Sequence, residues 1–267
     1  MSNKAKIREE VLKLNPIDDV MFRKMAEERE FCEEILRVIL DDSNLSVTES
    51  IPQWTGTNLQ GRSVILDAKC VTGDGRTIDV EVQKSNNDDH QRRVRYNGAI
   101  LTTNISDPGI MFENVPDVCI VFISRFDVFN ERHSLYHIDR VIRETGTIVN
   151  NGFSEIYVNA KVKDGSEVSE LMDVFTDDAA YSNKFPVTSS QKKHYKTSER
   201  GVETMCDIVQ KLVDEERAEG RLEGRAESNE KTAKLIGILT KNNDFITLKQ
   251  IADDPQLLEK LYKKFNL

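Results

Sequence analysis

The sequence is poor in cysteine and has no long apolar run, and each shortage argues against a class of protein. Its 267 residues include only four cysteines, which lie far apart and form no Cys-x-x-Cys pair. This spacing argues against a zinc site and favours a reducing compartment, the cytoplasm. No run of about 18 apolar residues is present, and the charged first residues lack the apolar stretch of a signal peptide. We therefore expect a cytoplasmic protein without a membrane span.

Positive charge is also in deficit. The 37 Lys and Arg residues face 46 Asp and Glu residues, which gives a net charge of -9. A protein that bound nucleic acid through its overall field would carry the opposite sign, so only local basic patches can contact a polyanion. One such patch follows Lys84 and comprises Arg92, Arg93 and Arg95, and the second comprises Lys192, Lys193, His194, Lys196 and Arg200. The alternative is that these clusters are simply solvated, as is common in highly charged chains.

The apolar pattern predicts helices and strands in alternation. Helical spacing predicts helices over residues 18–40 and 88–103. Strand-like alternation covers 62–71 and 77–83, and the Thr-Gly-Asp-Gly turn between them predicts an antiparallel hairpin. Residues 117–124 form a nearly continuous apolar run, typical of a strand buried on both faces. Further strands are expected at 47–54, 134–143 and 155–160. The order of elements predicts an α/β fold with a mixed sheet flanked by helices.

Three parts are expected along the chain: a domain at 1–175, a polar connector at 176–201 and a helical carboxy-terminal region at 202–267. The last begins with a long helix in which charges repeat every four residues. Arginines form one stripe and glutamates another, at Arg217, Arg221 and Arg225 and at Glu219, Glu223 and Glu227. Like charges at this spacing destabilise an isolated helix by roughly 0.2 to 0.5 kcal/mol per pair. The stripes predict a partner helix, as in a homo-oligomer, and a poorly ordered polar helix is the alternative.

Acidic side chains alternate along the predicted hairpin. Asp79, Glu81 and Gln83 share one face of the second strand, and Asp67 and Lys69 share one face of the first. If the strands pair with their apolar faces together, these side chains gather on one surface, where the carboxylates repel one another unless a cation lies among them. Oxygen ligands of this kind suit Mg²⁺ or Mn²⁺. The alternative is the solvated face of an edge hairpin, which antiparallel sheets commonly have.

The ordered motifs of the chain resemble those of the PD-(D/E)XK nucleases, and among these the recombination-promoting nuclease and transposase-like family. The matching segments are Asp19-Val20-Met21-Phe22-Arg23, Leu66-Asp67-Ala68-Lys69, residues 74–83, Gln91-Arg92 with Tyr96, Tyr136-His137, Glu144-Thr145-Gly146 and the Glu-Gly-Arg repeat near Gly220. The resemblance extends from about residue 15 to about residue 230. The chain departs from the family pattern at Leu66, where proline is usual, and at Gln91, where an acid is usual.

The resemblance implies a restriction-endonuclease-like fold and a metal-dependent DNA endonuclease. It implies that Asp67 and Glu81 bind Mg²⁺ or Mn²⁺, with the backbone carbonyl of Val82 as a third donor. Gln83 stands at the position of the lysine that gives these nucleases their name. Because glutamine adds no positive charge, we expect Lys69, on the face of Asp67, to supply a cation to the catalytic group.

DNA contacts are expected on the helix that follows the hairpin, at Arg92, Arg93 and Tyr96. Asp19 and Asp79 are lesser candidates for the site. A second function remains open because of Gln83 and the net charge of -9. In that alternative the chain is a nuclease-fold protein that has lost catalysis and acts as a DNA- or protein-interaction module.

Overall fold

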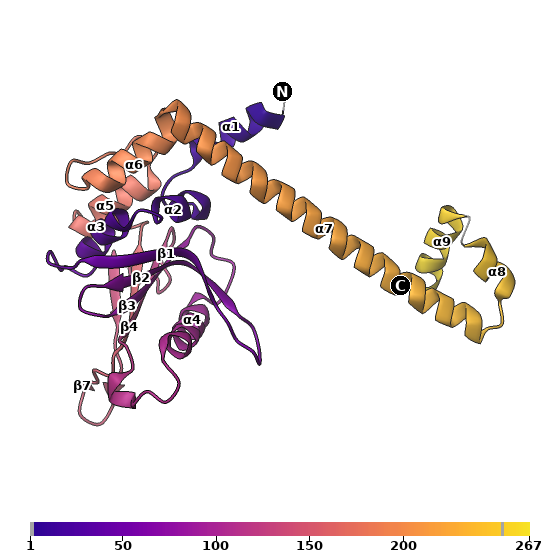
Figure 1. Ribbon diagram of the computed structural model, residues 1–267, viewed down its shortest axis with the longest axis horizontal. Helices are drawn as coiled ribbons and strands as arrows, with labels where there is room; N and C mark the ends of the chain where they lie inside the picture. Colours follow the sequence, from indigo (N-terminus) through magenta and orange to yellow (C-terminus); the bar gives the residue numbers. More distant parts are fainter. Residues whose placement is uncertain (1–2, 252–253) are drawn as a thin grey trace. The chain divides into compact units, whose positions relative to one another are not determined.

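The computed structural model describes residues 3–251 and 254–267 (Figure 1). The chain divides into two compact units, Met1–Ile208 and Val209–Leu267. The long helix α7 (Glu199–Lys241) begins in the first unit and continues in the second. Among the described residues, no helix is both long enough and apolar enough to cross a membrane.

The first unit is built on a mixed six-stranded sheet with the order β1-β2-β3-β4-β8-β5. Strands β1, β2 and β3 pair antiparallel, β4 lies parallel to β3 and to β8, and β5 is antiparallel to β8. The strands are β1 (Val47–Gly56), β2 (Val64–Thr72), β3 (Thr77–Gln83), β4 (Val118–Ser124), β5 (Leu135–Ile138) and β8 (Phe153–Asn159). A separate small hairpin is formed by β6 (Val141–Ile142) and β7 (Thr147–Ile148).

The predicted hairpin and the predicted central strand are both confirmed. Strands β2 and β3 pair antiparallel with Lys69 opposite Asp79. All seven residues of β4 are buried, which explains the apolar run in the sequence, because β4 lies between two parallel neighbours and under helices.

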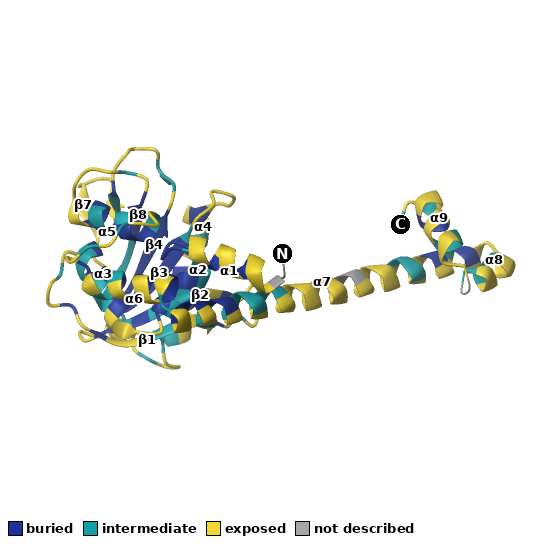
Figure 2. Cartoon of the chain, turned by 90° about the horizontal axis from the view of Figure 1, so that it is seen from above, coloured by how far each residue is buried: buried dark blue, intermediate teal, exposed yellow. Residues whose placement is uncertain are grey.

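Helices cover both faces of this sheet (Figure 1). On one side lie α2 (Asp19–Met25), α3 (Arg29–Ile39), α5 (Glu167–Thr176) and α6 (Pro186–Thr197), with α3 packed on β1 and α2 on β2 and β3. On the other side lies α4 (His90–Ile105), whose Val94 and Leu101 join a cluster with Leu66 and Phe122. Figure 2 shows the buried residues gathered in the sheet and in the helix faces turned toward it. The predicted mixed α/β fold is confirmed.

The helix predicted over residues 18–40 is in fact two helices, α2 and α3, which are separated at residues 26–28. The carbonyl of Ala26 leaves the helical pattern and instead accepts a hydrogen bond of 2.8 Å from the hydroxyl of Ser50 on β1. A side chain from a distant strand therefore stabilises the break, and helical periodicity cannot reveal such a partner. The sequence pattern also gave no indication of α1 (Asn3–Lys13) or of α5.

The second basic cluster is only in part a surface patch: Lys193, His194 and Arg200 are exposed, and its other two lysines are buried. Residues 176–201 contain α6, which packs on α2 and α3, and its Lys192 is fully buried while Lys196 is nearly so. The Lys192 ammonium donates to the carbonyls of Val174 and Ala180, at 2.9 and 3.1 Å, and also to that of Asp177. Lys196 pairs with Asp178 at 2.8 Å. These lysines hold the chain between α5 and α6 in place and cannot face DNA.

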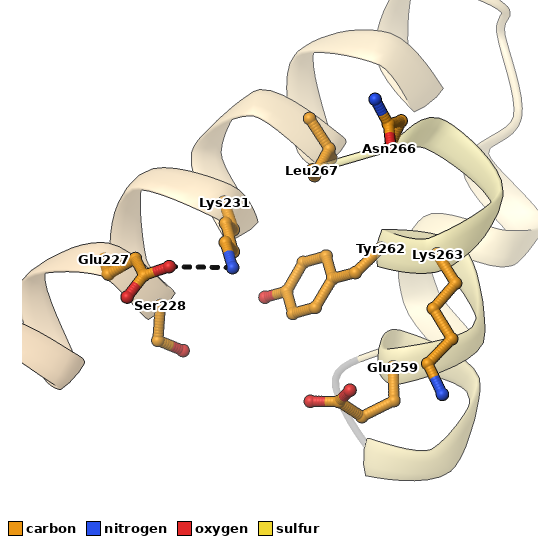
Figure 3. Close-up of a pocket in the computed structure, with 8 residues that line it drawn as sticks. All are labelled: Glu227, Ser228, Lys231, Glu259, Tyr262, Lys263, Asn266 and Leu267. Carbon is orange, nitrogen blue, oxygen red and sulfur yellow. Dashed lines mark ion pairs between the residues drawn. The ribbon is translucent and has the colours of Figure 1, made fainter.

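The second unit is helical, with the end of α7 packed against α8 (Phe245–Gln250) and α9 (Pro255–Phe265) around Leu235, Leu239, Leu261 and Tyr262. Figure 3 shows an open pocket of about 460 Å³ in this unit, into which the ring of Tyr262 points from α9. Lys231 and Glu227 form an ion pair of 2.9 Å on its α7 side. The tyrosine hydroxyl lies 2.6 Å from that of Thr232, so this contact joins α9 to α7.

Candidate active site

Strands β2 and β3 part where the two acidic residues lie. Their paired register ends at Ala68 opposite Val80, and side chains replace the backbone hydrogen bonds beyond it. The amide of Asp67 donates to Oε1 of Glu81 at 3.2 Å, and the amide of Val82 donates to Oδ2 of Asp67 at 3.0 Å. The two carboxylates therefore converge in the gap between the strands.

These carboxylates are not on a solvated face. The exposed fractions are 3% for Asp67, 1% for Glu81 and 0% for Asp79. The hairpin is not at the edge of the sheet, because β1 covers its outer strand, and helices α2 and α4 both contact the hairpin. Burial of ionisable groups is costly, so the alternative of a solvated edge hairpin is wrong.

An arginine pairs with each of the two acids. Arg23 of α2 donates to Oδ1 of Asp67 from Nη2 at 3.0 Å and from Nε at 3.2 Å, and its Nε also lies 2.6 Å from Asp19. Arg93 of α4 donates from Nη2 to Oε2 of Glu81 at 2.6 Å. Two helices that cover the sheet thus bring one guanidinium each to the point where the strands part.

Negative charge still dominates the site. Burial, followed by the charge of Asp67, raises the pKa of Glu81 from its ordinary 4.5 to about 7, although Arg93 acts in the opposite direction. Burial and the charge of Asp67 also raise the pKa of Asp19 to about 7. Burial raises the pKa of Asp79 well above its ordinary value, and the charges of Glu81 and Asp67 add to this effect. A further cation would relieve this repulsion.

The raised pKa of Glu81 predicts a pH-dependent stability of the metal-free protein. The folded chain holds this proton more tightly than the unfolded chain, so the free energy of unfolding should fall as the pH rises from about 4.5 to about 7. The full loss corresponds to roughly 3 kcal/mol. Urea denaturation in EDTA at pH 5 and pH 8 measures it. Glu81→Gln is the control, because its free energy of unfolding should lose less over the same range. Parallel losses in the two proteins would contradict the assignment.

Lys69 lies away from the two carboxylates. Its ammonium is 3.9 Å from Glu49 and 5.6 Å from the ring centre of Trp54, both on β1. Among the described residues, no ion pair joins Lys69 to Asp67 or Glu81. Gln83, by contrast, lies at the site, where its Oε1 accepts a hydrogen bond of 2.9 Å from Nη1 of Arg93.

A groove of about 740 Å³ lies beside the carboxylates. Its lining includes four arginines and all three predicted DNA contacts: Arg62, Arg92, Arg93, Arg95 and Tyr96, with Asp88 and Asp89 also present. Arg92 is largely exposed and pairs with Asp89 at 3.2 Å. The hydroxyl of Tyr96 donates to the carbonyl of Arg62 at 2.5 Å, so the ring also braces the groove wall. Arg93 alone among these residues both lines the groove and contacts Glu81.

Sequence reasoning missed the role of Arg23 and assigned Arg93 only to DNA. Arg23 is the last residue of the Asp-x-x-Phe-Arg segment that carries part of the family resemblance. The motif therefore marked Arg23, but it did not show which residue Arg23 contacts. That partner, Asp67, lies 44 residues further along the chain. The contact exists only because α2 packs on β2 and β3.

The site offers two carboxylates to a hard divalent cation, but no third acidic, histidine or cysteine ligand among the described residues. Asp67 and Glu81 converge as oxygen ligands, and Mg²⁺ commonly takes one or two carboxylates and completes its shell with water and phosphate oxygens. Within residues 3–251 and 254–267, no group of three or more His, Cys, Asp or Glu side chains is arranged to hold a metal. The amide of Val82 points to Asp67, and its carbonyl as a third donor stays a prediction.

Comparison with known proteins decides the family. The family model described as PD-(D/E)XK nuclease family transposase matches residues 16–173, which span α2 to α5 and the whole sheet. The chain belongs to this family. No curated protein and no solved structure matches the chain significantly. The PD-(D/E)XK family supports a nuclease, and its members generally use divalent metals. The sequence resemblance to it is confirmed.

Proposed function

We propose that the chain is a metal-dependent DNA endonuclease of the recombination-promoting, transposase-like type, which hydrolyses phosphodiester bonds. The observation that carries this proposal is the pair of buried carboxylates, Asp67 and Glu81, in the gap between β2 and β3. Buried acids with raised pKa values are unfavourable for folding, and such groups cluster at functional sites. The PD-(D/E)XK family membership gives the reaction class.

In this proposal, the carboxylates of Asp67 and Glu81 and the carbonyl of Val82 hold Mg²⁺ or Mn²⁺. Such an ion, when bound, polarises a phosphoryl oxygen and lowers the pKa of a water ligand. Arg23 holds the Asp67 carboxylate from one side, and the hydrogen bond from the amide of Val82 fixes its second oxygen. The protein's own contribution is thus to fix the ligands before substrate arrives.

The groove beside the site is the proposed path of the DNA backbone. Arg62, Arg92 and Arg95 line it, and arginine side chains bind phosphates without reading sequence. This local patch answers the difficulty posed by the net charge of -9. Because Arg92 lies at the surface, its side chain is free to exchange Asp89 for a phosphate.

Nicking of supercoiled plasmid by the wild-type protein tests the proposal. Conversion to nicked or linear DNA is expected with Mg²⁺ or Mn²⁺ and should stop when EDTA is added. Absence of conversion with both metals would contradict the proposed function.

An interaction module without catalysis is the second candidate, and the observation that favours it is the glutamine at position 83. Calorimetric titration with Mn²⁺ separates the two functions. An enzyme should show a binding site that Asp67→Ala or Glu81→Ala abolishes. A module should show no such site.

We further propose that the chain forms a homo-oligomer through α7. Residues 214–222 of this helix are exposed, and its charge stripes and Gly220 are compatible with a close second helix. Sedimentation of the full chain should give a mass that is a multiple of 30.5 kDa. A single species at the monomer mass at micromolar concentration would contradict this.

The four buried, unpaired cysteines support the proposed cytoplasmic location.

A further inference from the structure

The side chain of Gln83 is engaged at both of its ends. Its Nε2 donates to the carbonyl of Ser85 at 2.9 Å, and its Oε1 accepts from Nη1 of Arg93 at 2.9 Å. One N–H of this amide remains free, but an amide carries no positive charge to offset that of a phosphate. Gln83 therefore does not itself replace the lysine of the PD-(D/E)XK motif.

Arg93 contacts the side chain that stands at the lysine position of the motif. Its two terminal nitrogens form a fork, one bonded to Gln83 and the other to Oε2 of Glu81 at 2.6 Å. Its side chain keeps 35% of its surface exposed and lines the groove, so a phosphate in the groove can reach it.

Three other nearby cations pair with acids other than Glu81. Lys69 lies by Glu49, Lys84 pairs with Asp18 at 2.6 Å, and Arg23 serves Asp67 and Asp19. Among the described residues, Arg93 is the cation that contacts both Glu81 and Gln83.

We propose that Arg93 is the catalytic cation of this site and that Gln83 is the residue that positions it. The proposal rests on the nuclease function proposed above. Arg93 stabilises the negative charge that develops on the phosphate oxygens during hydrolysis, as the motif lysine does in related enzymes. A guanidinium stays protonated at any working pH, so its role is charge stabilisation and not proton transfer. The positive charge absent from the strand is thus supplied by helix α4.

This arrangement explains why a neutral residue stands at position 83. A lysine there would place an ammonium against the Arg93 guanidinium, and two like charges at such a distance repel. The glutamine oxygen instead accepts from the guanidinium and keeps the fork aligned with Glu81. Gln83→Lys should therefore lower the nicking rate when arginine is at position 93 and raise it when alanine is there.

The experiment compares single-turnover plasmid nicking in Mg²⁺ by the wild type, Arg93→Ala, Gln83→Lys and the double variant. Arg93→Ala should lower the rate by about 10²-fold to 10³-fold, a loss typical of removing a charge-stabilising donor. Gln83→Lys alone should also be slower than the wild type. The double variant should be at least about tenfold faster than Arg93→Ala, because the lysine now supplies the missing charge in the usual position.

Two further measurements separate catalysis from structure. DNA affinity in EDTA, measured by fluorescence anisotropy, should change far less than the rate in Arg93→Ala. Guanidinium ion added to Arg93→Ala should restore part of the rate. Arg29→Ala, which removes an exposed arginine of α3 that pairs with Glu30 and does not line the groove, is the control and should keep its rate within about threefold. If Arg93→Ala does not fold, Arg93→Lys replaces it, and its shorter side chain, unable to contact Glu81 and Gln83 together, should slow the reaction about tenfold.

The proposal is overturned if folded Arg93→Ala, or Arg93→Lys in its place, nicks DNA at the wild-type rate. It is also overturned if Gln83→Lys slows Arg93→Ala further, since the two residues would then act independently. Both results require an active wild type, so they leave the nuclease function standing. A wild type that does not nick DNA in either metal would instead remove the nuclease function and this inference together.

Discussion

Asp67→Ala and Glu81→Ala should each nick supercoiled plasmid at least about 10³-fold more slowly than the wild type, the loss usual for a group that acts in a catalytic unit. The two carboxylates converge in the gap between β2 and β3 and are the proposed metal ligands. Loss of either one removes half of the protein carboxylates offered to the metal. The nicking rate in Mg²⁺ and in Mn²⁺ is the quantity to measure.

Controls are needed because each alanine also removes a structural partner. Asp67→Ala removes one acceptor of Arg23 and the acceptor of the Val82 amide, and Glu81→Ala removes one acceptor of Arg93 and that of the Asp67 amide. Asp67→Asn and Glu81→Gln keep the side-chain shape while removing the charge, and they should be equally inactive. Glu113→Ala, which removes an exposed carboxylate, should retain full activity. Wild-type rates in folded Asn or Gln variants would contradict a metal-ligand role.

Lys192→Met should lower the free energy of unfolding by about 4 kcal/mol, because loss of the ammonium leaves one buried and two partly buried carbonyl groups without their donor. The lysine is fully buried and donates to Val174, Asp177 and Ala180. Burial lowers its pKa to about 8, so the ammonium is still charged at pH 7. Methionine fills a similar volume but has no hydrogen to donate. Urea denaturation at pH 7 measures the change.

Lys193→Met is the matched control for this variant, since Lys193 is the exposed next residue of α6. Its free energy of unfolding should stay within about 0.5 kcal/mol of the wild type. Equal stability of Lys192→Met and Lys193→Met would show that the hydrogen bonds to the carbonyls contribute little.

The secondary structure around the site could be predicted because its signals are local. Alternation and a Gly-containing turn predicted the β2–β3 hairpin, and an apolar run predicted the buried strand β4. The same reasoning failed at residues 26–28, where the helix break depends on Ser50 of β1. The sequence also did not reveal that Lys192 of α6 is buried, because the carbonyl groups that it contacts come from other parts of the fold.

The convergence of the two acids was predictable from the sequence, but the cations that contact them were not. Asp67 and Glu81 were named from alternation and from the family motif, and their convergence depends on one hairpin. Lys69 was expected to provide the charge because it follows Asp67 by two residues, yet its ammonium lies beside Glu49. The guanidinium groups at the site belong to α2 and α4. They meet the two acids because these helices pack on the sheet.

The sequence by itself determined the family and the mixed α/β fold and predicted that two acids lie together, because these depend on residue type and on short-range periodicity. Only the tertiary structure decided which cations meet those acids and which lysines are buried. The physical reason is that ion pairs and burial depend on which helix faces which strand, and that choice follows from packing the whole core.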